Sequence, residues 1–102
     1  ILSESSVQLL MQAQTTSAMI KYAPKSAEGY IYALGSWILQ TNQNGAASVL
    51  ACPGLFGTWP VIDLCRNYSV IFFTKQFLSE EKKEVYLKLK GIIDEQIVAN
   101  CN

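Results

Sequence analysis

Apolar residues recur at helical spacing at both ends of the chain. Ser3 is a suitable N-cap, and the apolar positions that follow it predict a helix over residues 4–14. Ser79 stands in the same way before a second helical pattern, which predicts a helix over residues 79–98. One apolar stripe along this second helix should pack against the rest of the protein. The stripe consists of Val85, Leu89, Ile92, Ile93 and Ile97.

Between the helices, aromatic and β-branched residues gather in short runs separated by turn residues, a pattern typical of an antiparallel meander. The predicted fold class is α+β, with one domain over residues 1–102 and a sheet over residues 30–75. The sheet should have about four strands, with the N-terminal and C-terminal helices packed together on one face. The expected strands are residues 30–40, 48–52, 58–64 and 69–75, with turns at 42–45 and 65–68.

Such a sheet has more apolar surface than two helices on one face can cover. Phe72 and Phe73 point to opposite faces of one strand, so one should lie beneath the second helix while the other stays short of cover. Trp37 and Trp59 are expected to be core or rim aromatics. An open sheet edge and an apolar patch favour association, so we expect a dimer or higher oligomer.

Composition narrows the possible functions. Eight basic and eight acidic residues cancel, which argues against a nucleic-acid surface because phosphate binding needs uncompensated positive charge. The basic stretch over residues 82–90 is interleaved with glutamates, which predicts a solvated helix face. No apolar run approaches the ~20 residues that span a bilayer. The chain starts at Ile1 without an initiator Met or signal peptide, which we expect of an excised piece of a longer protein.

Most catalytic chemistry is absent from the sequence. There is no histidine, which removes Ser-His-Asp and Cys-His arrangements and the commonest metal ligand. The cysteines lack Cys-x-x-Cys spacing, so we expect no metal and no cofactor. Residues 79–82 match Ser-x-x-Lys, the nucleophile and base of penicillin-binding proteins. At the start of an amphipathic surface helix, however, serine is the expected cap and lysine the expected solvent residue.

The three cysteines allow a prediction about disulfides. The last strand leaves the 65–68 turn for about 20 Å at ~3.3 Å per residue. The final helix returns about 30 Å at 1.5 Å per residue, which brings Cys101 back near Cys65. A Cys65–Cys101 disulfide is therefore our hypothesis, and it would favour an exported protein. Cys52 is expected to be a buried small apolar residue.

Two segments of the sheet resemble a known family. Residues 32–37, Tyr-Ala-Leu-Gly-Ser-Trp, look like the Tyr-Gly-x-Gly-Trp strand of serine β-lactamase-related hydrolases. Residues 51–58, Ala-Cys-Pro-Gly-Leu-Phe-Gly-Thr, resemble the third box of that family, usually Lys-Thr-Gly or His-x-Gly. The following two strands and the last helix are similar to the end of the family's fold, so the resemblance covers about residues 30–97. It implies a partial β-lactamase-like fold.

The resemblance also implies roles for four residues. Cys52 would stand where the family has Lys or His, Pro53 where it has Thr or Ser, and Gly54 at the family's Gly. The backbone N–H of Leu55 would then be an oxyanion-hole donor. Cys52 provides no positive charge and Pro53 no hydroxyl, which favours ester or peptide substrates over lactams. The family's Ser-x-x-Lys and Tyr-x-Asn boxes have no counterpart, so the chain alone would be inactive.

Two hypotheses about function remain. The first is the C-terminal part of an exported, periplasmic or extracellular serine hydrolase that acts on peptides, esters or lactams, with the remaining half of the parent as partner. The second is a stand-alone, non-enzymatic binding or dimerisation module, since small domains of the profilin or dynein-roadblock kind have the same order of elements. A self-sufficient module should unfold cooperatively as a monodisperse species, whereas a hydrolase fragment should aggregate or depend on its other half.

Overall fold

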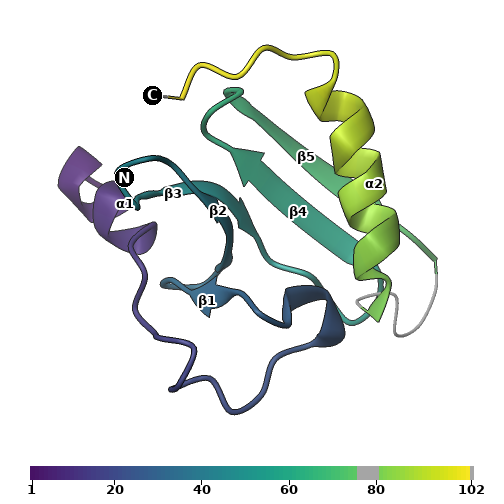
Figure 1. Ribbon diagram of the computed structural model, residues 1–102, viewed down its shortest axis with the longest axis horizontal. Coiled ribbons are helices and arrows are strands. Elements are labelled where there is room, and N and C mark those ends of the chain that lie inside the picture. Colours follow the sequence, from purple (N-terminus) through teal and green to yellow (C-terminus); the bar gives the residue numbers. More distant parts are fainter. Residues whose placement is uncertain (76–80, 102) are drawn as a thin grey trace.

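The computed structural model describes residues 1–75 and 81–101. Its centre is a five-stranded antiparallel sheet whose strands lie side by side in chain order (Figure 1). The strands are β1 (Ile31–Tyr32), β2 (Trp37–Thr41), β3 (Ala47–Ala51), β4 (Thr58–Asp63) and β5 (Tyr68–Phe73). The helices are α1 (Glu4–Leu10), the 3-10 turn η1 (Lys25–Ala27) and α2 (Lys83–Asp94). The predicted α+β class and antiparallel meander are confirmed.

The strand count differs from the prediction at one place. Residues 30–40 were expected to form one strand, but they form the hairpin β1–β2. The Ala33 N–H donates to the Ser36 carbonyl oxygen at 2.8 Å, and Gly35 has a φ of 95°. Glycine adopts a positive φ at little cost, so Gly35 lets the chain turn back and adds a fifth strand.

Both helices are shorter than predicted. Ser3 caps α1 as expected, since its hydroxyl accepts from the Ser6 N–H at 3.2 Å, but α1 ends at Leu10 rather than at residue 14. Helix α2 ends at Asp94 rather than at residue 98. The predicted start of that helix at Ser79 lies outside the described residues.

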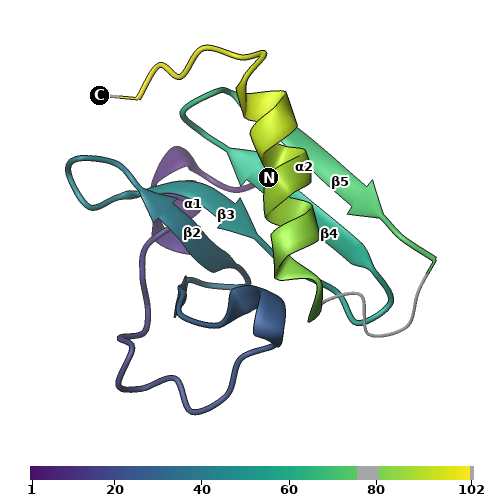
Figure 2. The same cartoon turned by 45° about the vertical axis from the view of Figure 1, so that its right-hand side comes forward.

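The prediction that both helices pack on one face of the sheet is wrong. Tyr86 of α2 packs on Val49 and Val61, whereas Met11, which directly follows α1, packs on Leu50. Since neighbouring residues of a strand point to opposite faces, Val49 and Leu50 place the two helices on opposite sides of the sheet. Figure 2 shows α2 in front of β4 and β5 and α1 behind the sheet. Each face therefore has one helix, and neither face is fully covered.

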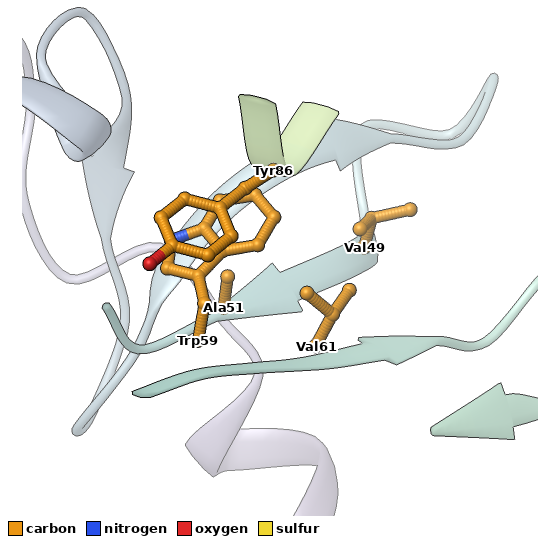
Figure 3. Packing of buried hydrophobic residues seen from close by; sticks show 5 residues of the cluster. All are labelled: Val49, Ala51, Trp59, Val61 and Tyr86. Atoms are coloured by element: carbon orange, nitrogen blue, oxygen red, sulfur yellow. The ribbon is translucent and has the colours of Figure 1, made fainter. Parts of the chain in front are cut away.

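The main core lies beneath α2. The Tyr86 ring stacks on Trp59 with centroids 4.9 Å apart (Figure 3). Phe72 borders both rings. Trp59 is fully buried, as predicted, and Phe72 rather than Phe73 faces the helix. The predicted packing stripe of α2 is wrong in its orientation, because three of its five residues are exposed. These are Val85, Leu89 and Ile92.

The turn between β4 and β5 is joined to the C-terminal segment. Cys65 and Cys101 form a disulfide with their Cα atoms 4.5 Å apart, and the Asn100 N–H donates to the Cys65 carbonyl oxygen at 2.7 Å. The predicted pairing is therefore confirmed. It fixes the segment after α2 against the end of the β4–β5 hairpin.

Candidate functional site

The four predicted site residues lie in the connection between β3 and β4. The Cys52 N–H donates to the Pro60 carbonyl oxygen at 3.2 Å, and the Gly54 N–H donates to the Thr58 carbonyl oxygen at 2.7 Å. These two bonds extend the β3–β4 ladder past the end of β3, with Pro53 between them. A Cβ atom at residue 54 would collide with the Thr58 hydroxyl, so any larger residue there would force the Thr58 side chain to move.

A tight turn follows and leaves one backbone donor without a partner. The Gly57 N–H donates to the Gly54 carbonyl oxygen at 3.0 Å, which places Leu55 and Phe56 at the two corners of the turn. Both side chains are exposed. The Leu55 N–H makes no hydrogen bond to any residue that the structure describes. This donor is therefore open to solvent or to a ligand oxygen.

An apolar groove of about 300 Å³ lies between α1 and the sheet, beside this connection. Its walls come from α1, from the β1–β2 turn and from the face of β3 and β4 that α2 does not cover. Ser36 is the only residue in its lining with a polar side chain other than a thiol. The lining residues are Val7, Leu10, Met11, Leu34, Gly35, Ser36, Leu50, Ala51, Cys52, Pro60 and Ile62.

Cys52 is exposed rather than buried, so the prediction of a buried small apolar residue is wrong. Its neighbour Ala51 points to the α2 face and is buried there, and strand alternation therefore turns Cys52 to the opposite face. On that face it lines the groove that α1 only partly covers. A free thiol thus lines the groove, three residues before Leu55 in the connection between β3 and β4.

A second polar feature lies at the other end of the sheet, under α2. Lys90 is 3% exposed and Asp63 is fully buried, and the Lys90 ammonium donates to the Asp63 carboxylate at 2.8 Å. Lys90 also donates to Asp94 at 2.7 Å, and the Tyr68 hydroxyl donates to Asp94 at 2.7 Å. Arg66 completes the group, since its backbone N–H donates to Asp63 at 2.8 Å and its guanidinium donates to the same carboxylate at 3.4 Å. We call these five residues the charge cluster.

The pKa shifts of Asp63 and Lys90 favour the charged form of each group. Burial by itself would raise the pKa of Asp63, but hydrogen bonds from Lys90 and Arg66 outweigh it and hold that pKa below its usual value. Burial by itself would lower the pKa of Lys90, and the bonds to Asp63 and Asp94 instead raise it. Burial and the bond to Asp94 raise the pKa of Tyr68.

The charge cluster is structural rather than catalytic. Lys90 donates to two carboxylates, not to a serine, threonine or cysteine, and so it is not placed as the base of a nucleophile. The prediction that residues 82–90 form a solvated helix face is wrong at Lys90. Its acidic partner Asp63 is distant in sequence, and no local pattern could indicate the pair.

Metal sites, membrane-spanning helices and similarity to known proteins were the remaining possible indications of function. Residues 1–75 and 81–101 contain no group of three or more His, Cys, Asp or Glu side chains that could hold a metal ion. None of their helices has the length and apolarity to cross a bilayer. The Ser79 of the Ser-x-x-Lys match lies outside the described residues. Comparison of the chain with models of protein families, with curated proteins and with solved structures finds no match.

Proposed function

We propose that this chain is the C-terminal part of a β-lactamase-related serine hydrolase that acts on acyl substrates. In this proposal the connection between β3 and β4 forms one wall of the acyl site. The Leu55 N–H donates to the oxyanion that develops on the substrate carbonyl, and the apolar groove holds the substrate's apolar portion. Cys52, Pro53 and Gly54 line the wall next to the reacting carbonyl.

The unpaired Leu55 N–H is the observation that carries the proposal. Most backbone N–H groups near a sheet end are bonded to a neighbouring strand, and Gly54 next to it follows this rule. A donor that is preorganised without a partner stabilises negative charge without having to break a bond first. The adjacent groove is almost wholly apolar, which suits a neutral ester or peptide more than a carboxylate-bearing lactam.

The remaining half of the parent protein would provide the nucleophilic serine and its base. One backbone donor stabilises charge but cannot start acylation, so the chain alone has no hydrolase activity in this proposal. The other half would pack on the face of the sheet that α1 leaves open, where Ile62 is exposed. The Cys65–Cys101 disulfide is compatible with an exported parent, periplasmic or extracellular.

The Leu55 N–H can be removed with little change to the turn. Leu55 occupies the first corner of the turn closed by Gly54 and Gly57, a position at which proline is favoured. In the protein translated from the complete reading frame, Leu55→Pro should lower kcat for a short-chain ester about 100–1,000-fold, the usual effect of losing one oxyanion donor. Leu55→Ala keeps the N–H and is the matched control. If Leu55→Pro keeps kcat within threefold of Leu55→Ala, the donor role is wrong.

A second candidate function is a stand-alone binding or dimerisation module. The open outer edge of β5 favours it, because an unpaired strand is a ready template for another chain. The two candidates differ in a simple measurement. A stand-alone module should unfold in one cooperative transition at the same midpoint whether or not the rest of the reading frame is present. A hydrolase part should gain stability when its other half is present.

A further inference from the structure

The two edges of the sheet differ in whether another segment of the chain is hydrogen-bonded to them. At β1, the Gln14 N–H donates to the Tyr32 carbonyl oxygen at 2.8 Å, and the Tyr32 N–H donates to the Thr15 hydroxyl at 2.8 Å. The segment after α1 therefore occupies the outer edge of β1. No described strand pairs with the outer edge of β5, which is six residues long. The open edge of the sheet is thus the longer one.

The register of β5 on β4 shows which backbone groups are free. Thr74 donates to Gly57 at 2.8 Å, and Phe73 lies opposite Thr58. Bonded and non-bonded pairs alternate in an antiparallel ladder, so the even-numbered residues of β5 bond to β4. The N–H and C=O groups of Ser69, Ile71 and Phe73 consequently point outward, away from the sheet.

Exposed apolar side chains flank this edge on both layers of the protein. On the face opposite α2, Ile71 is 55% exposed and Phe73 is 73% exposed. On the layer of α2, the three exposed apolar residues of the helix follow one of its flanks. Lys83 lies on the opposite flank, and its bond to the Glu28 carbonyl oxygen at 2.9 Å directs that flank toward the β1 side. Helical geometry therefore turns the stripe Val85, Leu89 and Ile92 toward the β5 side.

Within residues 1–75 and 81–101, the β5 edge shows none of the features that keep edge strands from pairing. Edge strands are usually protected by lysine, by proline, by a bulge or by a covering element. Residues 68–73 contain no charged residue and no proline, and the β4–β5 register has no shift over its six pairs. A continuous, uncharged edge of this kind favours association with another strand.

We propose that β5 pairs antiparallel with β5 of a second copy of this chain, forming a dimer with one continuous ten-stranded sheet. A two-fold axis through Ile71 uses all the outward-facing groups, with Ile71 opposite Ile71 and Ser69 opposite Phe73 of the other protomer. The same axis brings the exposed stripes of the two α2 helices toward each other. This proposal does not depend on the hydrolase function.

The exposed apolar area beside this edge reaches the lower bound of a specific interface. The exposed parts of Ile71, Phe73, Val85, Leu89 and Ile92, on the two sides of the edge together, amount to roughly 500 Å². A symmetric pairing that covers them would bury about 1,000 Å² over both protomers, the smallest area expected of a specific interface. A second copy fits the edge because strand and helix flanks are self-complementary about the axis.

Analytical ultracentrifugation of the 102-residue chain over a concentration series tests the proposal. The chain should sediment at twice the 11.3 kDa monomer mass at about 50 µM. Ile71→Lys and Leu89→Lys should each raise the dissociation constant of the dimer at least 30-fold. Circular dichroism should show that both variants remain folded. Ile62→Lys is the matched control, since Ile62 is exposed on the same sheet face one strand inward. It should leave the dimer intact.

Two results would overturn the proposal. One is a monomer at every concentration up to 200 µM. The other is a dimer that Ile62→Lys disrupts as much as Ile71→Lys does, because the interface would then be the sheet face rather than its edge.

Discussion

Replacing Lys90 with methionine tests whether the charge cluster holds α2 on the sheet. Methionine keeps the length of the side chain and removes the ammonium group that donates to Asp63 and Asp94. Asp94 is partly exposed, so water can replace the hydrogen bond from Lys90, and the loss of that bond costs little. Asp63 is fully buried and would keep as partners only the Arg66 backbone N–H at 2.8 Å and the Arg66 guanidinium at 3.4 Å. Leaving one member of a buried pair unpaired costs about 3–5 kcal/mol.

The surviving Arg66 bond places the expected loss near the lower end, at about 3 kcal/mol. A domain of this size has a total stability of about 5–15 kcal/mol, so the effect is large. With a urea m-value of about 1.5 kcal/mol per M, the unfolding midpoint should fall by about 2 M. Lys88→Met is the matched control on the exposed side of the same helix, and it should change stability by less than about 0.5 kcal/mol.

A further substitution separates lost charge pairing from lost packing. Asp63→Asn in the Lys90→Met background removes a buried carboxylate that has lost its Lys90 partner, so it should recover part of the lost stability. If Lys90→Met unfolds within 1 kcal/mol of Lys88→Met, or if Asp63→Asn makes the loss larger, the reasoning about the charge cluster is refuted. Urea unfolding monitored by tryptophan fluorescence measures all four proteins, because Trp59 is buried under α2.

The remaining predictions concern stability. Cys65→Ser with Cys101→Ser should lower the free energy of unfolding by about 3–4 kcal/mol, since the disulfide closes a loop with a sequence separation of 36; an unchanged urea midpoint would count against this. Gly91→Ala should stabilise α2 by about 0.5–1 kcal/mol, because nothing lies within 4 Å of the added Cβ; a lower melting temperature would show that the site is tighter than described. The raised pKa values of Lys90 and Tyr68 mean that the folded state binds more protons than the unfolded state above about pH 10. Stability should therefore be retained below that pH and fall as pH rises further, and the fall should shrink in Lys90→Met; a flat pH–stability curve between pH 9 and 11.5 would contradict this.

Local patterns predicted much of the fold because its strands and turns are encoded locally. Asn42 illustrates this, since its side-chain oxygen accepts from the N–H groups of Asn44 and Ala46 at 3.0 Å and so makes the β2–β3 turn. The disulfide could be predicted because it follows from the lengths of one strand and one helix. The β1–β2 hairpin was missed because residues 30–40 are rich in aromatic and aliphatic residues, as one strand would be, and only the positive φ of Gly35 separates two strands.

Features that depend on distant partners could not be predicted in this way. The apolar residues of α2 cover more than one flank of the helix, and hydropathy alone could not show that Tyr86 would stack on Trp59. Lys90 has a polar side chain on an amphipathic helix, and its burial depends on Asp63 in another element. The side of the sheet taken by α1 depends on Met11 packing near Leu50, which no local pattern specifies.

For the candidate site, the sequence indicated the segment but not its geometry. The resemblance pointed to residues 52–55. Only the structure shows which way the Cys52 side chain and the Leu55 N–H point. The exposure of Cys52 follows from strand alternation next to a buried Ala51. The unpaired Leu55 N–H depends on a turn whose closing bond joins Gly57 to Gly54. The groove needs α1 and the sheet together, so no single segment could reveal it.

The most direct test of the proposed function is fluorophosphonate labelling, followed by peptide mapping. The protein translated from the complete reading frame and the isolated 102-residue chain would be treated side by side with the same probe. If the proposed function is correct, the complete protein is labelled on a serine outside these 102 residues, within a Ser-x-x-Lys sequence, and the isolated chain is not labelled. A complete, folded protein that takes up no probe, or one whose label maps to a serine within the 102 residues, would contradict it.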